Sequence, residues 1–197
     1  MHYYNKKYPY LNYGYIDTDG IYTMFSIPPE ILMCEYIKTF KEKPKTFFDC
    51  GAATGFIVFL AQKLGMDAQG IDIKKYPRQS DELEELFTNG KIQIKSILDC
   101  EPIKSDIVFC NGTFTYFTEK ELSQVLNKFN KSKMIFAVHN TTEDTIAALA
   151  NGNKLTSCNK TRLIKSQNWW TDTFKKNGFN TKYIDYIRCF CITPTHE

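Results

Sequence analysis

The chain has 197 residues, of which 43% are hydrophobic and 24% are charged, and its formal net charge is +3. This length and composition predict one globular domain with a full hydrophobic core. The small net charge argues against nucleic acid as the main partner, because proteins that bind nucleic acid concentrate Lys and Arg on one face. No apolar run has membrane-spanning length and the N-terminus does not read as a signal peptide, so we expect a cytoplasmic protein without a membrane partner.

The first 27 residues differ in character from the rest of the chain. Tyrosine occupies positions 3, 4, 8, 10, 13, 15 and 22 among Asn, Gly, Lys and Asp, without a helical period. Two interpretations stay open. The segment is either a surface extension whose rings pack against the domain, or a lid whose polar-tipped rings close over a ligand.

Residues 28–197 form the predicted domain, in which strand-like and helix-like runs alternate. Strands are expected at 46–50, 68–73, 92–97, 106–110, 133–138, 181–187 and 188–193. Helices are expected at 28–42, 55–65, 81–88, 118–130, 142–151 and 167–177. This alternation predicts an α/β fold, with a mainly parallel sheet covered by helices on both faces. Ligands bind such sheets at the carboxyl ends of the strands.

The most informative stretch is residues 47–55, which read Phe-Phe-Asp-Cys-Gly-Ala-Ala-Thr-Gly. It predicts a buried strand, a tight turn with an exposed backbone, and a helix start, where glycine would let a ligand approach closely. The spacing matches neither the dinucleotide motif Gly-x-Gly-x-x-Gly nor a phosphate-binding loop. The acid before the turn, Asp49, would repel a pyrophosphate but suits a cationic amino group. We therefore expect a nucleoside-type cofactor that is not a phosphate ester.

Further polar residues follow the other predicted strands. Asp72 ends the second strand, where nucleotide-binding α/β folds place the acid that takes the ribose hydroxyls. Asp99, Asn111 and His139 also fall at or just past predicted strand ends. These side chains should converge with Asp49 on one edge of the sheet.

Over residues 45–195 the chain resembles the class I S-adenosylmethionine-dependent methyltransferases. Asp49-x-Gly51-x-x-x-Gly55 is similar to their first motif, and Ile97-Leu98-Asp99 to the third, whose acid faces the adenine amino group. Residues 105–111 and 133–138 resemble their fourth and fifth strands. The resemblance implies a Rossmann-like, doubly wound sheet of seven strands, mainly parallel, with an antiparallel last strand.

The resemblance also implies S-adenosylmethionine as the cofactor and S-adenosylhomocysteine as its product. It places the cofactor contacts at Tyr22, Asp49, Gly51, Ala52, Ala53, Gly55, Asp72, Ile73, Leu98, Asp99 and Asn111. No metal is expected, because the seven cysteines form no Cys-x-x-Cys pair and the chain has only three histidines. We interpret the cysteines as reduced thiols, mostly in the core.

Two residues are candidates for catalysis. Methyl transfer is an in-line displacement that requires alignment and exclusion of water, and a base only where the acceptor must lose a proton. His139 is the only histidine well placed to act as that base, although it could instead bond loop backbone. Tyr116 stands where many small-molecule members carry a histidine, and it could contact either the acceptor or the adenine.

Three functions stay open. The first is a methyltransferase for a small molecule, aromatic or nitrogenous in view of the tyrosine-rich segment. The second is a nucleic-acid methyltransferase, because Asn111-Gly112-Thr113-Phe114 keeps the first and last residues of the Asn-Pro-Pro-Phe motif of adenine amino-methylating enzymes. The third is a non-catalytic module that keeps the fold to bind a cofactor or partner.

Overall fold

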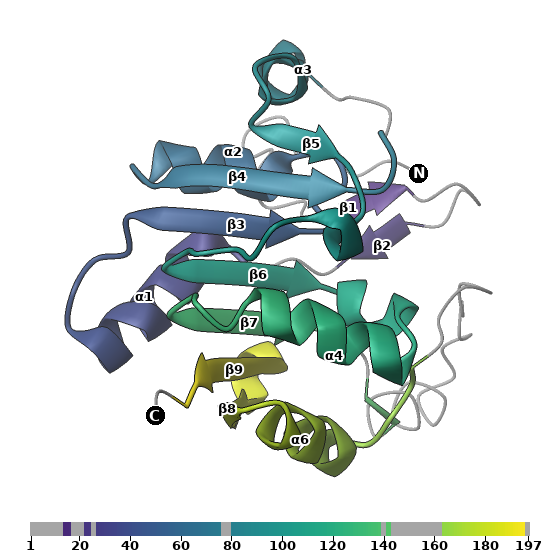
Figure 1. Ribbon diagram of the computed structural model, residues 1–197. Coiled ribbons are helices and arrows are strands. Elements are labelled where there is room, and N and C mark those ends of the chain that lie inside the picture. Colours follow the sequence, from purple (N-terminus) through teal and green to yellow (C-terminus); the bar gives the residue numbers. More distant parts are fainter. Residues whose placement is uncertain are drawn as a thin grey trace.

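The core of the protein is one seven-stranded sheet in the order β5-β4-β3-β6-β7-β9-β8 (Figure 1). The computed structural model describes residues 27–75, 80–138, 141–142 and 163–195, and the backbone of 14–16 and 22–24. The strands are β3 (Thr46–Cys50), β4 (Asp67–Asp72), β5 (Ile92–Ile94), β6 (Ile107–Asn111), β7 (Met134–Val138), β8 (Phe179–Ile184) and β9 (Cys189–Pro194). The strands from β3 to β7 pair in parallel, whereas β9 is antiparallel to both β7 and β8. The predicted doubly wound fold with an antiparallel last strand is confirmed.

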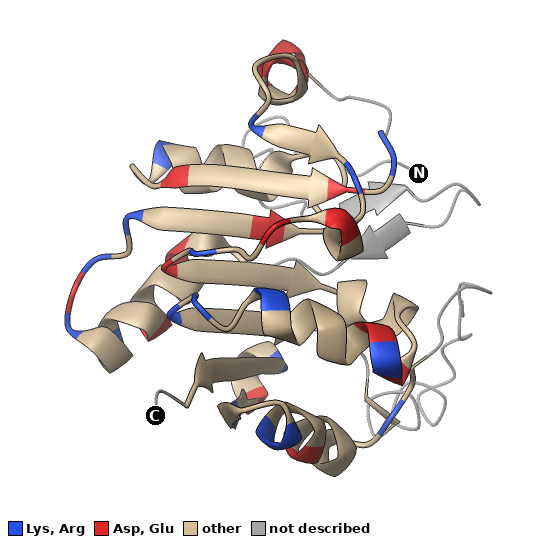
Figure 2. Ribbon diagram, in the orientation of Figure 1, with Lys and Arg blue, Asp and Glu red and all other residues tan. Residues whose placement is uncertain are grey.

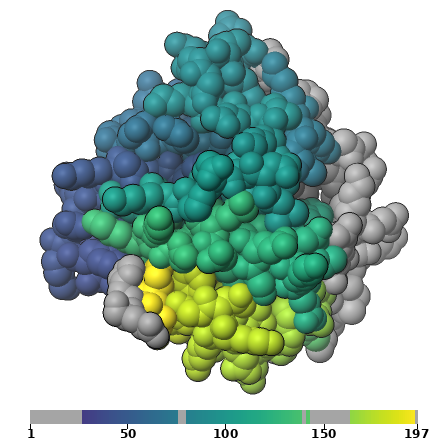
Figure 3. Space-filling model, viewed as in Figure 1, coloured from purple at the N-terminus to yellow at the C-terminus, as the bar shows by residue number. Residues whose placement is uncertain are grey.

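Helices cover both faces of this sheet. One face carries α1 (Pro29–Phe40), α2 (Phe56–Lys63) and α3 (Asp81–Thr88), and the other carries α4 (Glu119–Lys128) and α6 (Gln167–Lys176). Figure 3 shows the second face, with the side chains of α4 above those of α6. A reciprocal capping box begins α4: Thr118 Oγ1 accepts from the Glu121 amide at 3.2 Å, and Glu121 Oε2 accepts from the Thr118 amide at 2.7 Å.

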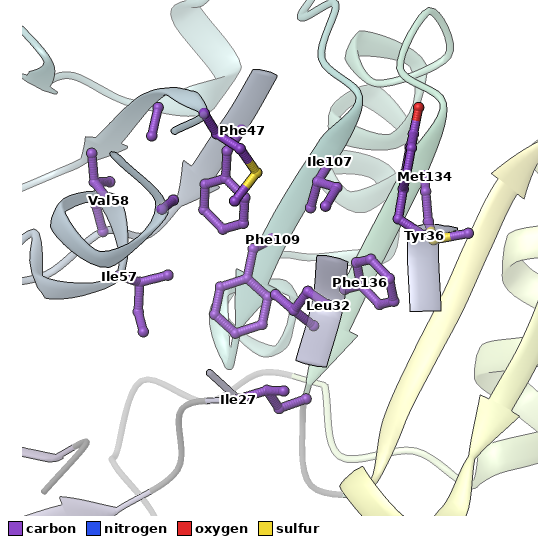
Figure 4. Packing of buried hydrophobic residues seen from close by; sticks show 14 of the residues in the cluster. Ile27, Leu32, Tyr36, Phe47, Ile57, Val58, Ile107, Phe109, Met134 and Phe136 are labelled. Atoms are coloured by element: carbon purple, nitrogen blue, oxygen red, sulfur yellow. The ribbon is translucent and has the colours of Figure 1, made fainter. Parts of the chain in front are cut away.

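The alternation of side chains along the central strands builds two separate cores. In β6, Ile107 and Phe109 pack with α1 and α2, whereas Val108 and Cys110 pack with α4 and α6. All four side chains are at most 1% exposed. Figure 4 shows the first core, where the rings of Phe109 and Phe47 lie with centroids 6.4 Å apart. Burial on both faces explains why β6 is apolar from Ile107 to Cys110.

Several predicted boundaries are wrong. The strand expected at 92–97 ends at Ile94, and a 3-10 helix, η2 (Ile97–Asp99), follows it. The strand expected at 181–187 begins at Phe179 and ends at Ile184, because a second 3-10 helix, η4 (Asp185–Ile187), takes its last residues. The helix expected at 142–151 lies almost wholly outside the described residues.

In the N-terminal segment, two short strands that the sequence did not predict, β1 (Gly14–Ile16) and β2 (Tyr22–Met24), pair antiparallel with each other. The division into a segment of residues 1–27 and a domain of 28–197 stays a prediction. Ile27, the first residue of the described range 27–75, is buried in the first core.

The carboxyl ends of β3, β4, β5 and β6 lie at the same edge of the sheet, as parallel pairing requires. Acidic residues colour the ends of β3 and β4 and the turn of η2 at this edge (Figure 2). Among the helices in the described part of the chain, none has the length and apolar character to cross a bilayer. The six cysteines within the described ranges are free thiols.

Candidate cofactor site

The turn between β3 and α2 is held by hydrogen bonds from its own amides. The amides of Gly51 and Ala52 both donate to the carbonyl of Ile71, at 2.8 and 2.9 Å, and the amide of Gly55 donates to Ala52 O at 2.7 Å. These donors are used within the protein. A ligand contact of these three residues would therefore use groups other than their amides, and their predicted role in cofactor binding stays a prediction.

The two glycines of the turn are required by the protein itself. Their φ angles are 93° at Gly51 and 86° at Gly55, in the left-handed region that favours glycine. A Cβ at Gly51 would lie 2.2 Å from Thr113 Oγ1, and a Cβ at Gly55 would lie 2.4 Å from Ile92 Cδ1. Backbone conformation and packing thus explain these glycines, whereas the sequence suggested clearance for a ligand.

Asp72 ties the end of β4 to this turn. Its Oδ2 accepts a hydrogen bond from the Ala53 amide at 2.9 Å, and its Oδ1 accepts one from the Lys74 amide at 3.1 Å. Burial raises the pKa of Asp72, and the backbone donors oppose that shift. A carboxylate has about four lone-pair positions, so beside the backbone donors of Ala53, Ile73 and Lys74 the Asp72 carboxylate keeps capacity to accept a further bond. A hydroxyl group of a ligand is a natural donor for this carboxylate.

Asp49 lies one residue before the end of β3 and is buried, with 3% exposure. Burial, with a smaller contribution from the Asp72 carboxylate, raises the pKa of Asp49 to about 8. The free protein therefore holds a proton on this carboxyl group at neutral pH. A cationic ligand group beside it would favour the carboxylate and release that proton.

Three further predicted residues, Ile73, Leu98 and Asp99, follow the ends of β4 and β5. Ile73 follows Asp72 directly and is 75% exposed, which is unusual for a large apolar side chain. Past β5, the Ser96 hydroxyl accepts a bond from the Leu98 amide at 3.2 Å and begins η2, which holds Leu98 half-buried and Asp99 exposed. The exposed apolar surface of Ile73 suits a planar ring of a ligand.

A second surface lies past the end of β6. Asn111 ends the strand, and a 3-10 helix, η3 (Thr113–Tyr116), follows it. The amide of Leu163 donates to Thr115 O at 3.0 Å and joins residues 163–166 to η3. Tyr116 and Ile164, the next residue of each segment, are 42% and 43% exposed. We call these two side chains the η3 surface.

The structure brings together most of the predicted site residues. Asp49, Asp72, Asp99 and Asn111 all lie at the predicted edge of the sheet. His139 lies outside the described residues, and Tyr22 is placed only through its backbone pairing with Ile16. The roles of all these residues stay predictions.

Thr113 and Lys74 are site residues that the sequence did not indicate. The Lys74 amide belongs to the backbone, and no side-chain pattern marks it. The Thr113 hydroxyl donates mainly to the Cys50 carbonyl, at 2.6 Å, with the Asn111 carbonyl as a more distant acceptor at 3.4 Å. A threonine after a strand-ending Asn-Gly is too common to have marked that role.

A family model described as a methyltransferase domain matches residues 41–178, more than half of the chain. The matched range runs from the approach to β3 through α6 and includes β3, β4, η2, β6 and η3. The chain belongs to this family. The chain has the Rossmann-like fold of the class I S-adenosylmethionine-dependent enzymes, as its sheet order and its resemblance to their motifs indicate. No curated relative matches the chain in sequence.

Solved structures with the same fold are known at low sequence identity. The plantazolicin methyltransferase BpumL, crystallised with a pentazolic desmethylPZN analogue and S-adenosylhomocysteine, matches with a TM-score of 0.58 and 15% identity over 78% of this chain. Magnesium protoporphyrin IX methyltransferase (ChlM) from Synechocystis PCC 6803, with bound S-adenosylhomocysteine, matches with a TM-score of 0.55 and 15% identity over 83% of this chain. These matches cover 65% of BpumL and 79% of ChlM, so the chain spans just under two thirds of BpumL.

S-adenosylmethionine is the cofactor of this family, and the residues of the site fit it. Asp72 has acceptor capacity for a ribose hydroxyl, and Ile73 offers exposed apolar surface to the adenine. The raised pKa of Asp49 marks a buried acid that a cationic ammonium would stabilise as the carboxylate. Within the described ranges, no group of three or more His, Cys, Asp or Glu side chains could hold a metal.

Proposed function

We propose that this chain transfers the methyl group of S-adenosylmethionine to a small-molecule acceptor that carries an apolar or aromatic part. The observation that supports this proposal most strongly is the η3 surface. Exposed tyrosine and isoleucine side chains are suited to packing against an apolar or planar group. The cationic side chain beside them, Lys165, already pairs with Glu119 at 3.1 Å and lies over the Trp169 ring.

Different residues of the chain have different roles in such a reaction. Asp72 binds the ribose, and Asp49 balances the charge of the methionine end. When bound, the cofactor supplies an electrophilic methyl group on a sulfonium. The η3 surface then orients the acceptor, which is the main task of a methyltransferase because in-line displacement depends on alignment. His139 stays the proposed base for an acceptor that must lose a proton.

The buried position of Phe114 weighs against the nucleic-acid alternative. In a target-base pocket built from Asn111 and Phe114, the ring of Phe114 would need to be accessible to the base. Phe114 is 1% exposed and packs against Phe174 with ring centroids 6.3 Å apart. The methyltransferase would have to unpack its second core to offer this ring.

The proposal is tested by incubating the protein with S-adenosylmethionine labelled in the methyl group and a cell extract. The labelled products are then sorted into small molecules, RNA, DNA and protein. We expect label in the small-molecule fraction with the wild-type protein and no label with the Asp72→Asn variant. The control is Asp67→Asn, which makes the same change at the exposed far end of β4 and should keep the label. Labelled RNA or DNA would support the nucleic-acid alternative. Cofactor binding without label in any fraction would support a non-catalytic module. A cytoplasmic location stays part of the proposal.

A further inference from the structure

One hydrogen bond links η3 to the end of β3, directly before residues 51–55, which we call the cofactor turn. Thr113, the first residue of η3, donates its hydroxyl to the carbonyl of Cys50 at 2.6 Å. Cys50 is the last residue of β3, directly before the turn that holds Gly51. The bond therefore joins two segments that are 63 residues apart in sequence.

The absence of a side chain at Gly51 makes this bond possible. A Cβ at this position would lie 2.2 Å from Thr113 Oγ1, which is closer than atoms in proteins approach. At Gly65, where φ is 86°, a Cβ would meet nothing within 4 Å. The two glycines have similar backbone conformations, so only the contact with Thr113 distinguishes them.

The other residues of η3 carry the link onward to Tyr116. The Thr115 hydroxyl donates to Gly112 O at 2.6 Å, and Phe114 is anchored in the second core. The amide of Thr115 also donates to Gly112 O, at 3.3 Å. These bonds make η3 a compact turn. Its bond from Thr113 to β3 acts together with the bonds from the Gly112 amide to Val138 O, at 2.6 Å, and from the Leu163 amide to Thr115 O, at 3.0 Å, to position Tyr116.

We propose that Thr113 is a positioning residue that holds the η3 surface in register with the cofactor turn, so that binding of the cofactor orders the acceptor side. The inference rests on the proposed function for the meaning of the η3 surface. Thr113 acts through its hydroxyl and through the space left at Gly51, without touching cofactor or acceptor itself.

Three variants separate the hydroxyl from the shape of the side chain. Thr113→Val keeps the shape and removes the donor, Thr113→Ser keeps the donor, and Thr113→Ala removes both the donor and the side chain's bulk. Amide hydrogen exchange of residues 112–117, measured with and without S-adenosylhomocysteine, reports the order of η3. In the Val variant we expect the amides of residues 112–117 to exchange roughly tenfold faster than in wild type, because one hydrogen bond is lost. We also expect S-adenosylhomocysteine to give these amides no protection in this variant. The Ser variant should behave as wild type.

The inference would be overturned if the amides of residues 112–117 exchanged at equal rates in the Val and Ser variants. It would also be overturned if S-adenosylhomocysteine protected these amides equally in the two variants. If wild type shows no binding of S-adenosylhomocysteine, the proposed function fails, whereas the exchange rates of the free variants still decide whether Thr113 holds η3. The two failures are therefore distinguishable.

A second measurement tests the contact between Thr113 and Gly51 directly. Gly51→Ala should lower Tm more than Gly65→Ala, because it adds a clash to the strain of a positive φ. In the Thr113→Ala background this excess should disappear. An equal Tm loss from Gly51→Ala in both backgrounds would show that Thr113 does not occupy that space.

Discussion

The Asp72 carboxylate accepts a hydrogen bond from the Ala53 amide at 2.9 Å, and this bond holds Ala53 in a left-handed conformation with φ of 47°. The cofactor turn and the end of β4 are thereby joined through one side chain. Left-handed backbone is costly for alanine, so the turn carries local strain at the site itself.

Replacing Ala53 by glycine should relieve that strain. We expect Ala53→Gly to raise the free energy of unfolding by up to about 1 kcal/mol, because alanine at positive φ is destabilising. Ala52→Gly is the matched control: Ala52 is buried beside Gly70, so its loss should lower stability. Chemical denaturation of both variants checks the prediction, and a destabilised Ala53→Gly would contradict it.

The raised pKa of Asp49 predicts that cofactor binding releases a proton. Below pH 8 the free protein holds this proton, whereas a bound ammonium lowers the pKa of Asp49 and favours the carboxylate. The affinity for S-adenosylhomocysteine should therefore rise with pH up to about 8, by at most about tenfold per pH unit for one proton, and then level off.

Calorimetry in two buffers of different ionisation enthalpy measures this proton release. At pH 7 wild type should release a fraction of a proton more than Asp49→Asn, which cannot titrate at this position. The ligand's own ionisation is common to both proteins and cancels in the difference. Equal proton release by the two proteins would rule out a titrating Asp49.

If the N-terminal segment is a lid, deletion of residues 1–26 should leave a folded core. Ile27, the last residue of the predicted segment, is buried in the first core and is kept in this truncation. We expect a cooperative thermal transition near that of wild type, together with weaker binding of S-adenosylhomocysteine and loss of methyl transfer. Tyr22→Ala in the full chain tests the ring predicted to reach the cofactor. A stable truncated protein with unchanged affinity and turnover would reduce the segment to a surface extension.

The fold was predictable because each strand of the sheet is marked by its own sequence. β6 is an apolar run between Ser105-Asp106 and Asn111, and β3 ends at an acid and a glycine turn. The ends of β5 and β8 were not predictable, because side chains and backbone beyond the strands decide them. The Ser96 hydroxyl begins η2, and Arg188 takes a left-handed φ of 48° after η4.

The acids of the site were predictable in the same way, since strand order alone brings Asp49, Asp72 and Asp99 to one edge. The role of Thr113 was not, because its bond to Cys50 spans 63 residues. The reason for the glycine at position 51 was not predictable either, because its contact with Thr113 is also distant in sequence. Only the three-dimensional contact shows that it faces a protein side chain.

The most direct test of the account is calorimetric titration of the purified protein with S-adenosylhomocysteine. We predict binding at one site per chain, weakened roughly 10- to 150-fold in Asp72→Asn, since hydrogen bonds to a charged group contribute about 1.5–3 kcal/mol. Asp67→Asn, at the exposed far end of the same strand, should bind as wild type does. Absence of binding by the folded wild-type protein, or equal binding by Asp72→Asn, would contradict the assignment of this edge of the sheet as the cofactor site.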